Sequence, residues 1–150
     1  MKKEETILMI AKSILDANNE CSLTGSLMLK LRCIDLGREI HDIDILMSNH
    51  ASCINIPKDI NLEVMGMASD NVHLKYRYGD TDICIDILSS NEDFEEINGW
   101  RLASIKGLIS AKINYCRKND DSFNKHYDDL LKLGVNYTSL REKETSDYPF

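Results

Sequence analysis

The amino-acid sequence predicts an α+β domain with a mixed β-sheet flanked by helices. Apolar side chains recur at helical spacing over residues 4–17, and they return to that spacing over residues 102–133. Between these regions, several short segments alternate apolar and polar residues, as strands with one buried face do. The resulting order of helix, strand, helix, several strands and two helices is typical of α+β architecture.

Several predicted helices and strands end at residues that favour a helix end or a turn. Asn18 and Asn19 end the first helix, Gly37 ends the second, and a Gly79–Asp80 turn joins the last two strands into a hairpin. Residues 48–60 are expected to be irregular. The predicted helices are 4–17, 27–36, 102–116 and 122–133, and the predicted strands are 21–24, 40–47, 62–67, 72–78 and 82–88.

Length and composition limit what kind of protein this is. With 150 residues we expect a single domain spanning 1–150, with a mobile polar tail at 141–150. The net charge of −7 disfavours extended binding to duplex DNA, because the two surfaces repel each other. The sequence shows neither a membrane-spanning apolar stretch nor a signal-peptide pattern, so we expect a cytoplasmic protein without membrane contact. Its five scattered cysteines predict reduced thiols rather than zinc ligands or disulfides.

The most informative segment is the predicted strand that contains Asp42 and Asp44. Residues two apart in a strand point to the same face, so these two carboxylates stand side by side while Ile43 and Ile45 enter the core. Two close carboxylates repel each other unless a cation lies between them, and Mg²⁺ prefers oxygen ligands. The pattern is therefore compatible with a metal site, and equally with a polar face on an edge strand.

Two further segments strengthen the case for a site. Gly25 and Ser26 lie where a strand meets a helix, a place where backbone can approach a ligand and bind an anion, although an ordinary turn would look the same. Asp86 lies on a later alternating strand between isoleucines, so it requires a partner. A metal ion shared with the first two carboxylates would supply that partner; a salt bridge or a simply exposed face would look the same. We expect Asp86 to join them rather than Asp82, which lies about 13 Å further along the strand at about 3.3 Å per residue.

Together, these residues resemble the nucleotidyltransferase superfamily related to polymerase beta. Its pattern is Gly-Ser, then Asp-x-Asp on the next strand, then a third Asp on a later strand. Within it, a closer resemblance is to the small bacterial branch with abortive-infection-type nucleotidyltransferase toxins and lincosamide-type nucleotidyltransferases. That branch carries an Arg before the first Asp, a helical Ala-Lys signature and a Lys/Arg-Asp/His-x-x-Asp-Leu signature. Similar residues stand here at Arg38, Ala111–Lys112 and Lys125–Leu130.

This resemblance implies a metal-dependent nucleotidyltransferase. Such an enzyme moves a nucleoside monophosphate from a nucleoside triphosphate to a hydroxyl acceptor and releases pyrophosphate, with two Mg²⁺ ions as cofactors. The implied metal-binding and catalytic residues are Asp42, Asp44 and Asp86. The implied nucleotide-binding residues are Gly25, Ser26, Arg38, Lys112, Lys125 and Asp129. Either lysine would look the same if it were simply a solvated helical residue.

Alternative interpretations remain open at this point. The chain could be a protein of the same fold that binds a nucleotide or a partner with little turnover, such as a toxin–antitoxin component. It could also carry a merely solvated acidic face. The partners expected are a nucleoside triphosphate, an acceptor that is a small molecule, a protein or an RNA end, and a second copy in a homodimer. The four histidines do not group in the sequence and are interpreted as non-ligands, although His41 and His126 could line the cleft.

Overall fold

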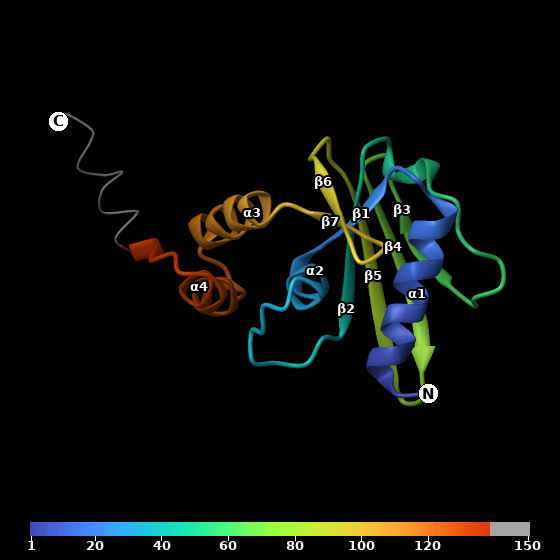
Figure 1. Ribbon diagram of the computed structural model, residues 1–150, viewed down its shortest axis with the longest axis horizontal. Helices are drawn as coiled ribbons and strands as arrows, with labels where there is room; N and C mark the ends of the chain where they lie inside the picture. The colour runs from blue at the N-terminus through green and yellow to red at the C-terminus, as the bar shows by residue number, and fades with distance from the viewer. Residues whose placement is uncertain (139–150) are drawn as a thin grey trace. The chain divides into compact units, whose positions relative to one another are not determined.

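The structure is a computed structural model, and it describes residues 1–138 (Figure 1). The chain divides into two compact units, residues 1–104 and residues 105–150, and each is described by itself. The sequence suggests one domain over 1–150, and its expected mobile tail at 141–150 lies outside the described residues. No helix among the described residues is both long and apolar enough to cross a membrane.

The first unit is built on a seven-stranded mixed sheet with the strand order β3-β4-β5-β2-β1-β7-β6. The strands β2 and β5 are parallel, as are β1 and β7, and the other neighbours are antiparallel. The edges are β3 and β6. The strands are β1 (Cys21–Thr24), β2 (Asp42–Met47), β3 (Glu63–Met67), β4 (Asn71–Tyr78), β5 (Thr81–Ser89), β6 (Phe94–Ile97) and β7 (Trp100–Ala103).

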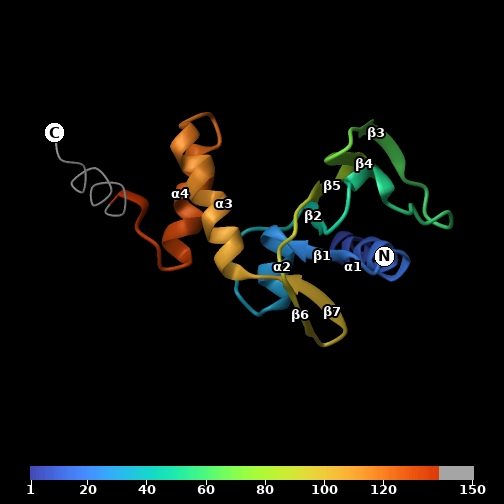
Figure 2. The same cartoon turned by 90° about the horizontal axis from the view of Figure 1, so that it is seen from above.

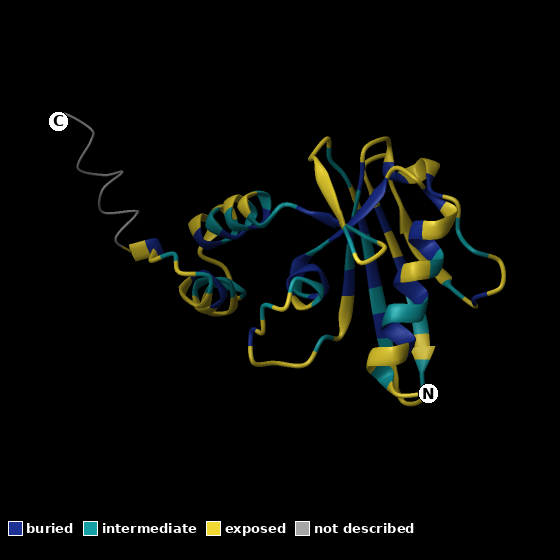
Figure 3. Cartoon of the chain, in the orientation of Figure 1, coloured by how far each residue is buried: buried dark blue, intermediate teal, exposed yellow. Residues whose placement is uncertain are grey.

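Two helices contact strands β1 and β2 of this sheet, α1 (Lys3–Ala17) and the short α2 (Gly25–Leu31) (Figures 1 and 2). Alternation along the strands places the isoleucines of β2 and β5 on one face, whereas Leu46 and Leu88 point to the other. Ile43, Ile45, Ile83, Ile85 and Ile87 are completely buried there, as are Ile7, Ile10 and Ile14 of α1 (Figure 3). Asp42, Asp44 and Asp86 alternate with these isoleucines and point to the opposite face.

Asn18 and Arg101 fasten the end of α1 to the sheet. Asn18 is buried, and its amide donates to the carbonyl of Ile14 within α1 and to that of Asn55 across a loop, at 2.8 Å each. The guanidinium of Arg101 donates to the carbonyls of Leu15, Asn18 and Cys21. These contacts satisfy carbonyl groups that a helix end leaves without partners.

The second unit contains α3 (Ile105–Lys118) and α4 (Phe123–Lys132), which pack against each other. Its core is formed by Cys116, Leu130 and Tyr137, all almost fully buried. The prediction of two helices at this end of the chain is confirmed, with α3 beginning three residues later than expected.

Two sequence predictions were wrong. No strand was expected over residues 94–103, and residues 102 and 103 were assigned to a helix. Residues 94–103 instead form a β-hairpin of β6 and β7 joined at Asn98–Gly99, which both adopt positive φ. Helix α2 was expected to continue to residue 36, but it ends at Leu31, and Cys33 has a φ of 66°. The sheet therefore has two more strands than predicted. The mixed α+β class itself is confirmed.

Candidate functional site

Asp44 and Asp86 lie side by side on neighbouring parallel strands. The pairing of β2 with β5 places Asp44 directly opposite Asp86, and each is intermediate in exposure. Adjacent strands are about 4.8 Å apart, and residues in register point to the same face. The structure thus brings together two of the three carboxylates singled out in the sequence.

Asp42 lies on the same face, one pleat away. It is opposite Cys84, which separates Asp82 from Asp86 along β5. The pKa of the Cys84 thiol is raised by its burial and by the negative charges of Asp42, Asp86 and Asp82. This face of the sheet is therefore strongly acidic, and it favours a cationic ligand over a bare anion.

Gly25 is packed directly against the carboxylate of Asp44. Its φ is +68°, and a Cβ placed there would overlap Asp44 Oδ2 and lie 3.2 Å from both the Cβ and the Cγ of Asp44. Asp44 also pairs with Thr24, the residue before this glycine. Only glycine satisfies both the backbone conformation and the close approach, so the glycine noted in the sequence forms one wall of the acidic site.

Asp86 has a basic partner, because His73 of β4 lies opposite it and forms an ion pair between Nδ1 and Asp86 Oδ1. Burial raises the pKa of the Asp86 carboxyl, and the negative charge of Asp42 adds to this, while the neighbouring His73 acts in the opposite direction. The carboxylate is therefore held in place but is easier to protonate than an ordinary aspartate.

From the sequence alone, His73 was interpreted as one of four non-ligand histidines, and its contact with Asp86 was not expected. A signal was present, because the Gly79–Asp80 turn was recognised. That turn pairs Tyr78 with Thr81, and counting five residues outward along each strand places His73 opposite Asp86. A hairpin register derived from the turn would have identified the contact.

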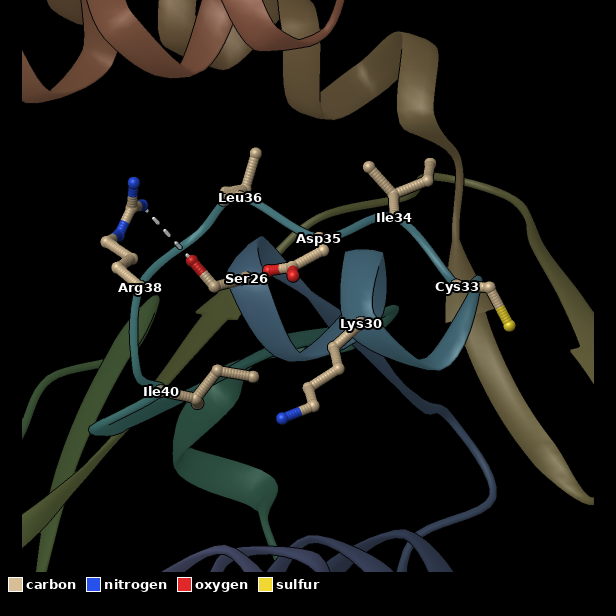
Figure 4. A pocket seen from close by; sticks show the side chains of 8 residues that line it. All are labelled: Ser26, Lys30, Cys33, Ile34, Asp35, Leu36, Arg38 and Ile40. Atoms are coloured by element: carbon tan, nitrogen blue, oxygen red, sulfur yellow. Dashed lines mark hydrogen bonds between the residues drawn. The ribbon is translucent and has the colours of Figure 1, made fainter.

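Ser26 and Arg38 lie together at a separate pocket of about 210 Å³ beside α2 (Figure 4). Arg38 Nη2 donates to Ser26 Oγ at 3.3 Å. The pocket is also lined by Lys30, whose ammonium is 2.7 Å from Glu4 of α1. With only seven residues, α2 supplies a weak helix dipole. Any affinity of this pocket for phosphate would therefore depend on its side chains.

The donor chemistry of the acidic face fits a hard divalent cation. Asp42, Asp44 and Asp86 offer carboxylate oxygens from one face of two paired strands, and Mg²⁺ prefers such ligands. Among residues 1–138, however, no group of three His, Cys, Asp or Glu side chains is arranged closely enough to hold a metal ion as they stand. A bound ion would therefore require these carboxylates to move closer to one another.

Three further residues named from the sequence lie in the second unit. Lys112 is 5% exposed, and its ammonium is 2.7 Å from Oδ2 of the fully buried Asp129. This ion pair joins α3 to α4. Lys125 is exposed on α4, and its neighbour His126 stacks on Tyr115 with ring centroids 4.7 Å apart. Thus Lys112 and Asp129 hold the two helices together, while Lys125 is accessible to a ligand.

Comparisons with known proteins address the fold. No family model matches the sequence, and no curated protein matches it. A solution structure of the antibiotic-resistance factor ANT(2″)-Ia is similar, with a TM-score of 0.52 and 15% identity, over 97% of this chain and 96% of that chain. A crystal structure of ANT(2″)-Ia in complex with adenylyl-2″-tobramycin is also similar. Its TM-score is 0.51 at 15% identity, over 95% of this chain and 99% of that chain.

At 15% identity the likeness establishes architecture and not activity. The chain therefore has the nucleotidyltransferase fold, a mixed sheet flanked by helices, as the sequence predicted.

Proposed function

We propose that the chain is a metal-dependent nucleotidyltransferase. It would move a nucleoside monophosphate from a nucleoside triphosphate to a hydroxyl acceptor and release pyrophosphate. The observation that carries this proposal is the alignment of Asp44 with Asp86 across β2 and β5, with Asp42 on the same face and Gly25 packed against Asp44. In a fold shared with known nucleotidyltransferases, this arrangement is hard to explain as a purely solvated surface.

The reaction forms one bond and breaks one. An acceptor oxygen bonds to the α-phosphorus, the bond from that phosphorus to the bridging oxygen of the β-phosphate breaks, and pyrophosphate leaves with the bonding electrons. The acceptor loses its proton. Asp86 is the carboxylate that would help to receive it, as the resemblance implies.

The other residues would bind and orient the donor. Asp42, Asp44 and Asp86 would hold two Mg²⁺ ions, which when bound neutralise the phosphate charge. Ser26 and Arg38, which already contact each other, would donate hydrogen bonds to phosphate oxygens.

The residues of the second unit would act in two ways. Lys125 is exposed and would provide a further phosphate contact. Lys112 and Asp129 would act through the helix pair that they hold together.

The finer assignment rests on the sequence signatures at Arg38, Lys112 and Lys125. They favour the small bacterial branch of toxins and antibiotic-modifying enzymes that the sequence resembles. The neighbour's complex contains an adenylyl group on tobramycin. By analogy, a small hydroxyl-bearing molecule is the first acceptor class to test, ahead of proteins and RNA ends. A nucleoside triphosphate donor is in keeping with the cytoplasmic location expected from the sequence.

Thermal melting tests this proposal. A nucleoside triphosphate should stabilise the wild-type protein only when Mg²⁺ is present, because bare phosphates are repelled by the acidic face. At a ligand concentration of about 100 times the dissociation constant, the gain should be about 2.7 kcal/mol. Asp44→Asn should abolish the gain while leaving the chelator-treated protein as stable as wild type or slightly more so.

Asp82→Asn is the matched control. Asp82 lies on the same strand face, but it pairs with Arg77 and Lys75 rather than with Asp44. That variant should keep the Mg²⁺-dependent gain. Equal stabilisation with and without Mg²⁺, or a large loss of stability in Asp44→Asn under chelator, would contradict the proposal, since the latter indicates a buried salt bridge.

A further inference from the structure

His73 belongs to a row of residues that crosses the acidic face. Strand pairing aligns Gly66 of β3 with His73 of β4, His73 with Asp86 of β5, and Asp86 with Asp44 of β2. All four lie in register and so share one face. The imidazole is therefore the immediate neighbour of the candidate metal ligands on the side away from α2.

Two features of β3 and β4 leave room for this ring. Gly66 has no side chain, and a Cβ added there would lie 3.9 Å from the Cβ of His73, at ordinary contact distance. The β3–β4 pairing also shifts register between Val64 and Gly66, which is a β-bulge. Bulges are typical of places where a strand re-aims a neighbouring side chain.

The contact also determines how Asp86 can act. A carboxylate oxygen only accepts hydrogen bonds, so His73 Nδ1 is the donor and Asp86 Oδ1 the acceptor. This leaves Oδ2 as the oxygen through which Asp86 would reach a cation. Fixing one oxygen of a ligating carboxylate restricts its orientation, as partners behind the ligands of metal sites commonly do.

Stability alone does not account for the pair. The His73 side chain is 58% exposed and that of Asp86 is 30% exposed. Ion pairs this open to solvent contribute little to stability, and often nothing measurable. The interior of the sheet is already well packed by isoleucines on the opposite face. The pairing therefore has more effect on the orientation of Asp86 than on folding.

We propose that His73 is a positioning residue, which holds Asp86 Oδ1 and so orients the carboxylate for a divalent cation shared with Asp44. The proposal rests on the proposed function, because that function assigns Asp86 as a ligand. It adds a residue outside the carboxylate set, on a strand that contributes no carboxylate to the site.

Direct binding of Mn²⁺, measured from the electron paramagnetic resonance signal of the free ion, tests this without nucleotide or turnover. His73→Leu should raise the dissociation constant for Mn²⁺ about tenfold, the lower end of the usual effect of such partners. His73→Asn should restore most of the affinity, because its amide nitrogen occupies nearly the position of Nδ1. Neither variant should change the melting temperature in chelator by more than a degree or two.

His50→Leu is the matched control. His50 also pairs with an aspartate through Nδ1, at 3.4 Å from Asp70, and its side chain is 64% exposed, but it lies beyond the opposite end of β2. This variant should bind Mn²⁺ like the wild type. Should His73→Leu fail to fold, His73→Gln is the second variant, because its longer side chain moves the amide away from the Nδ1 position.

The outcomes separate this proposal from the proposed function. Wild-type binding of Mn²⁺ that is lost in Asp86→Asn but unchanged, or tighter, in His73→Leu or His73→Gln would overturn the role of His73 alone. Absence of Mn²⁺ binding in the wild type, at concentrations that saturate carboxylate sites, would overturn both. A loss in His73→Leu that His73→Asn restores would support the positioning role.

Discussion

Replacing Gly25 by alanine should damage the protein in two separable ways. The first is backbone strain, because φ is +68° and an L-residue in the left-handed region costs about 1–2 kcal/mol. The second is overlap, because the new methyl group would collide with the Asp44 carboxylate. Overpacking of this kind costs about 1–3 kcal/mol. We therefore expect Gly25→Ala to lower the free energy of unfolding by about 2–5 kcal/mol in total.

Gly79 offers a matched control for the strain. It also has a positive φ, +58°, but a Cβ added there would meet nothing within 4 Å. Gly79→Ala should therefore show only the first cost. Both substitutions lower the conformational entropy of the unfolded chain by the same amount, so this contribution cancels when the two variants are compared. Urea denaturation of both variants at one pH gives the difference between their free energies of unfolding. The comparison requires that the free energy depend on urea concentration with the same slope in both variants.

A double-mutant cycle identifies the source of that difference. Asp44→Ala removes the colliding carboxylate and leaves only the Cβ contact at 3.2 Å, so in that background the cost of Gly25→Ala should fall toward the cost of Gly79→Ala, about 1–2 kcal/mol. The expected coupling between positions 25 and 44 is about 1–3 kcal/mol, within the range seen for residues in contact. Equal costs for the two single glycine variants, with no coupling to Asp44, would refute the close packing described for this wall of the site.

Two predictions concern the helix pair. Lys112→Met should destabilise the second unit by about 3–5 kcal/mol, because it leaves the carboxylate of Asp129 buried without its partner. The double variant with Asp129→Leu should recover most of this in urea denaturation. The exposed Lys125→Met should change the free energy of unfolding by less than about 0.5 kcal/mol, and full stability in Lys112→Met would contradict the buried pair. The pKa of His126 should lie below the ordinary 6.5, because burial and then the charges of Lys112 and Lys125 disfavour its protonated form. The unfolded chain then binds the proton more readily, so stability should fall as the pH decreases from about 6.5 toward the folded-state pKa; an imidazole NMR titration at or above 6.5 would contradict this.

The sequence contained enough information for the strands that carry the acidic face. Alternation along 82–88 and around Asp42–Asp44 predicted which side chains share a face, and the observed strands agree within two residues at each end. The alignment of Asp44 with Asp86 was harder to predict. It depends on a parallel pairing between strands separated by two others in the chain, and no turn defines that register.

The hairpin at 94–103 was not predicted from the sequence, for a different reason. Its turn residues, Asn98–Gly99, are a strong hairpin signal, yet Phe94–Ile97 is an edge strand that is largely exposed. Such a strand has no apolar alternation, because it buries almost nothing. The neighbouring β7 is only four residues long and is followed soon by α3. Its buried Leu102 and Ala103 were therefore assigned to the helix.

The role of Lys112 could not be derived from its sequence signature. A helical lysine in an Ala-Lys signature is compatible with a phosphate contact, with solvent exposure or with a buried ion pair. The distinction depends on Asp129, seventeen positions away on the next helix, which approaches only when α3 and α4 pack. Tertiary contacts of this kind are absent from the local pattern.

Following the α-phosphate of the donor tests directly whether the protein is a nucleotidyltransferase. The protein is incubated with Mg²⁺ and a nucleoside triphosphate labelled at either the α- or the γ-phosphate, together with fractionated small molecules, proteins or RNA as acceptors. The α-label should become covalently attached to an acceptor, which gains the mass of a nucleoside monophosphate. The γ-label should leave as pyrophosphate, and Asp44→Asn should show neither product. Attachment of the γ-label, or equal product formation by Asp44→Asn, would contradict nucleotidyl transfer at this site.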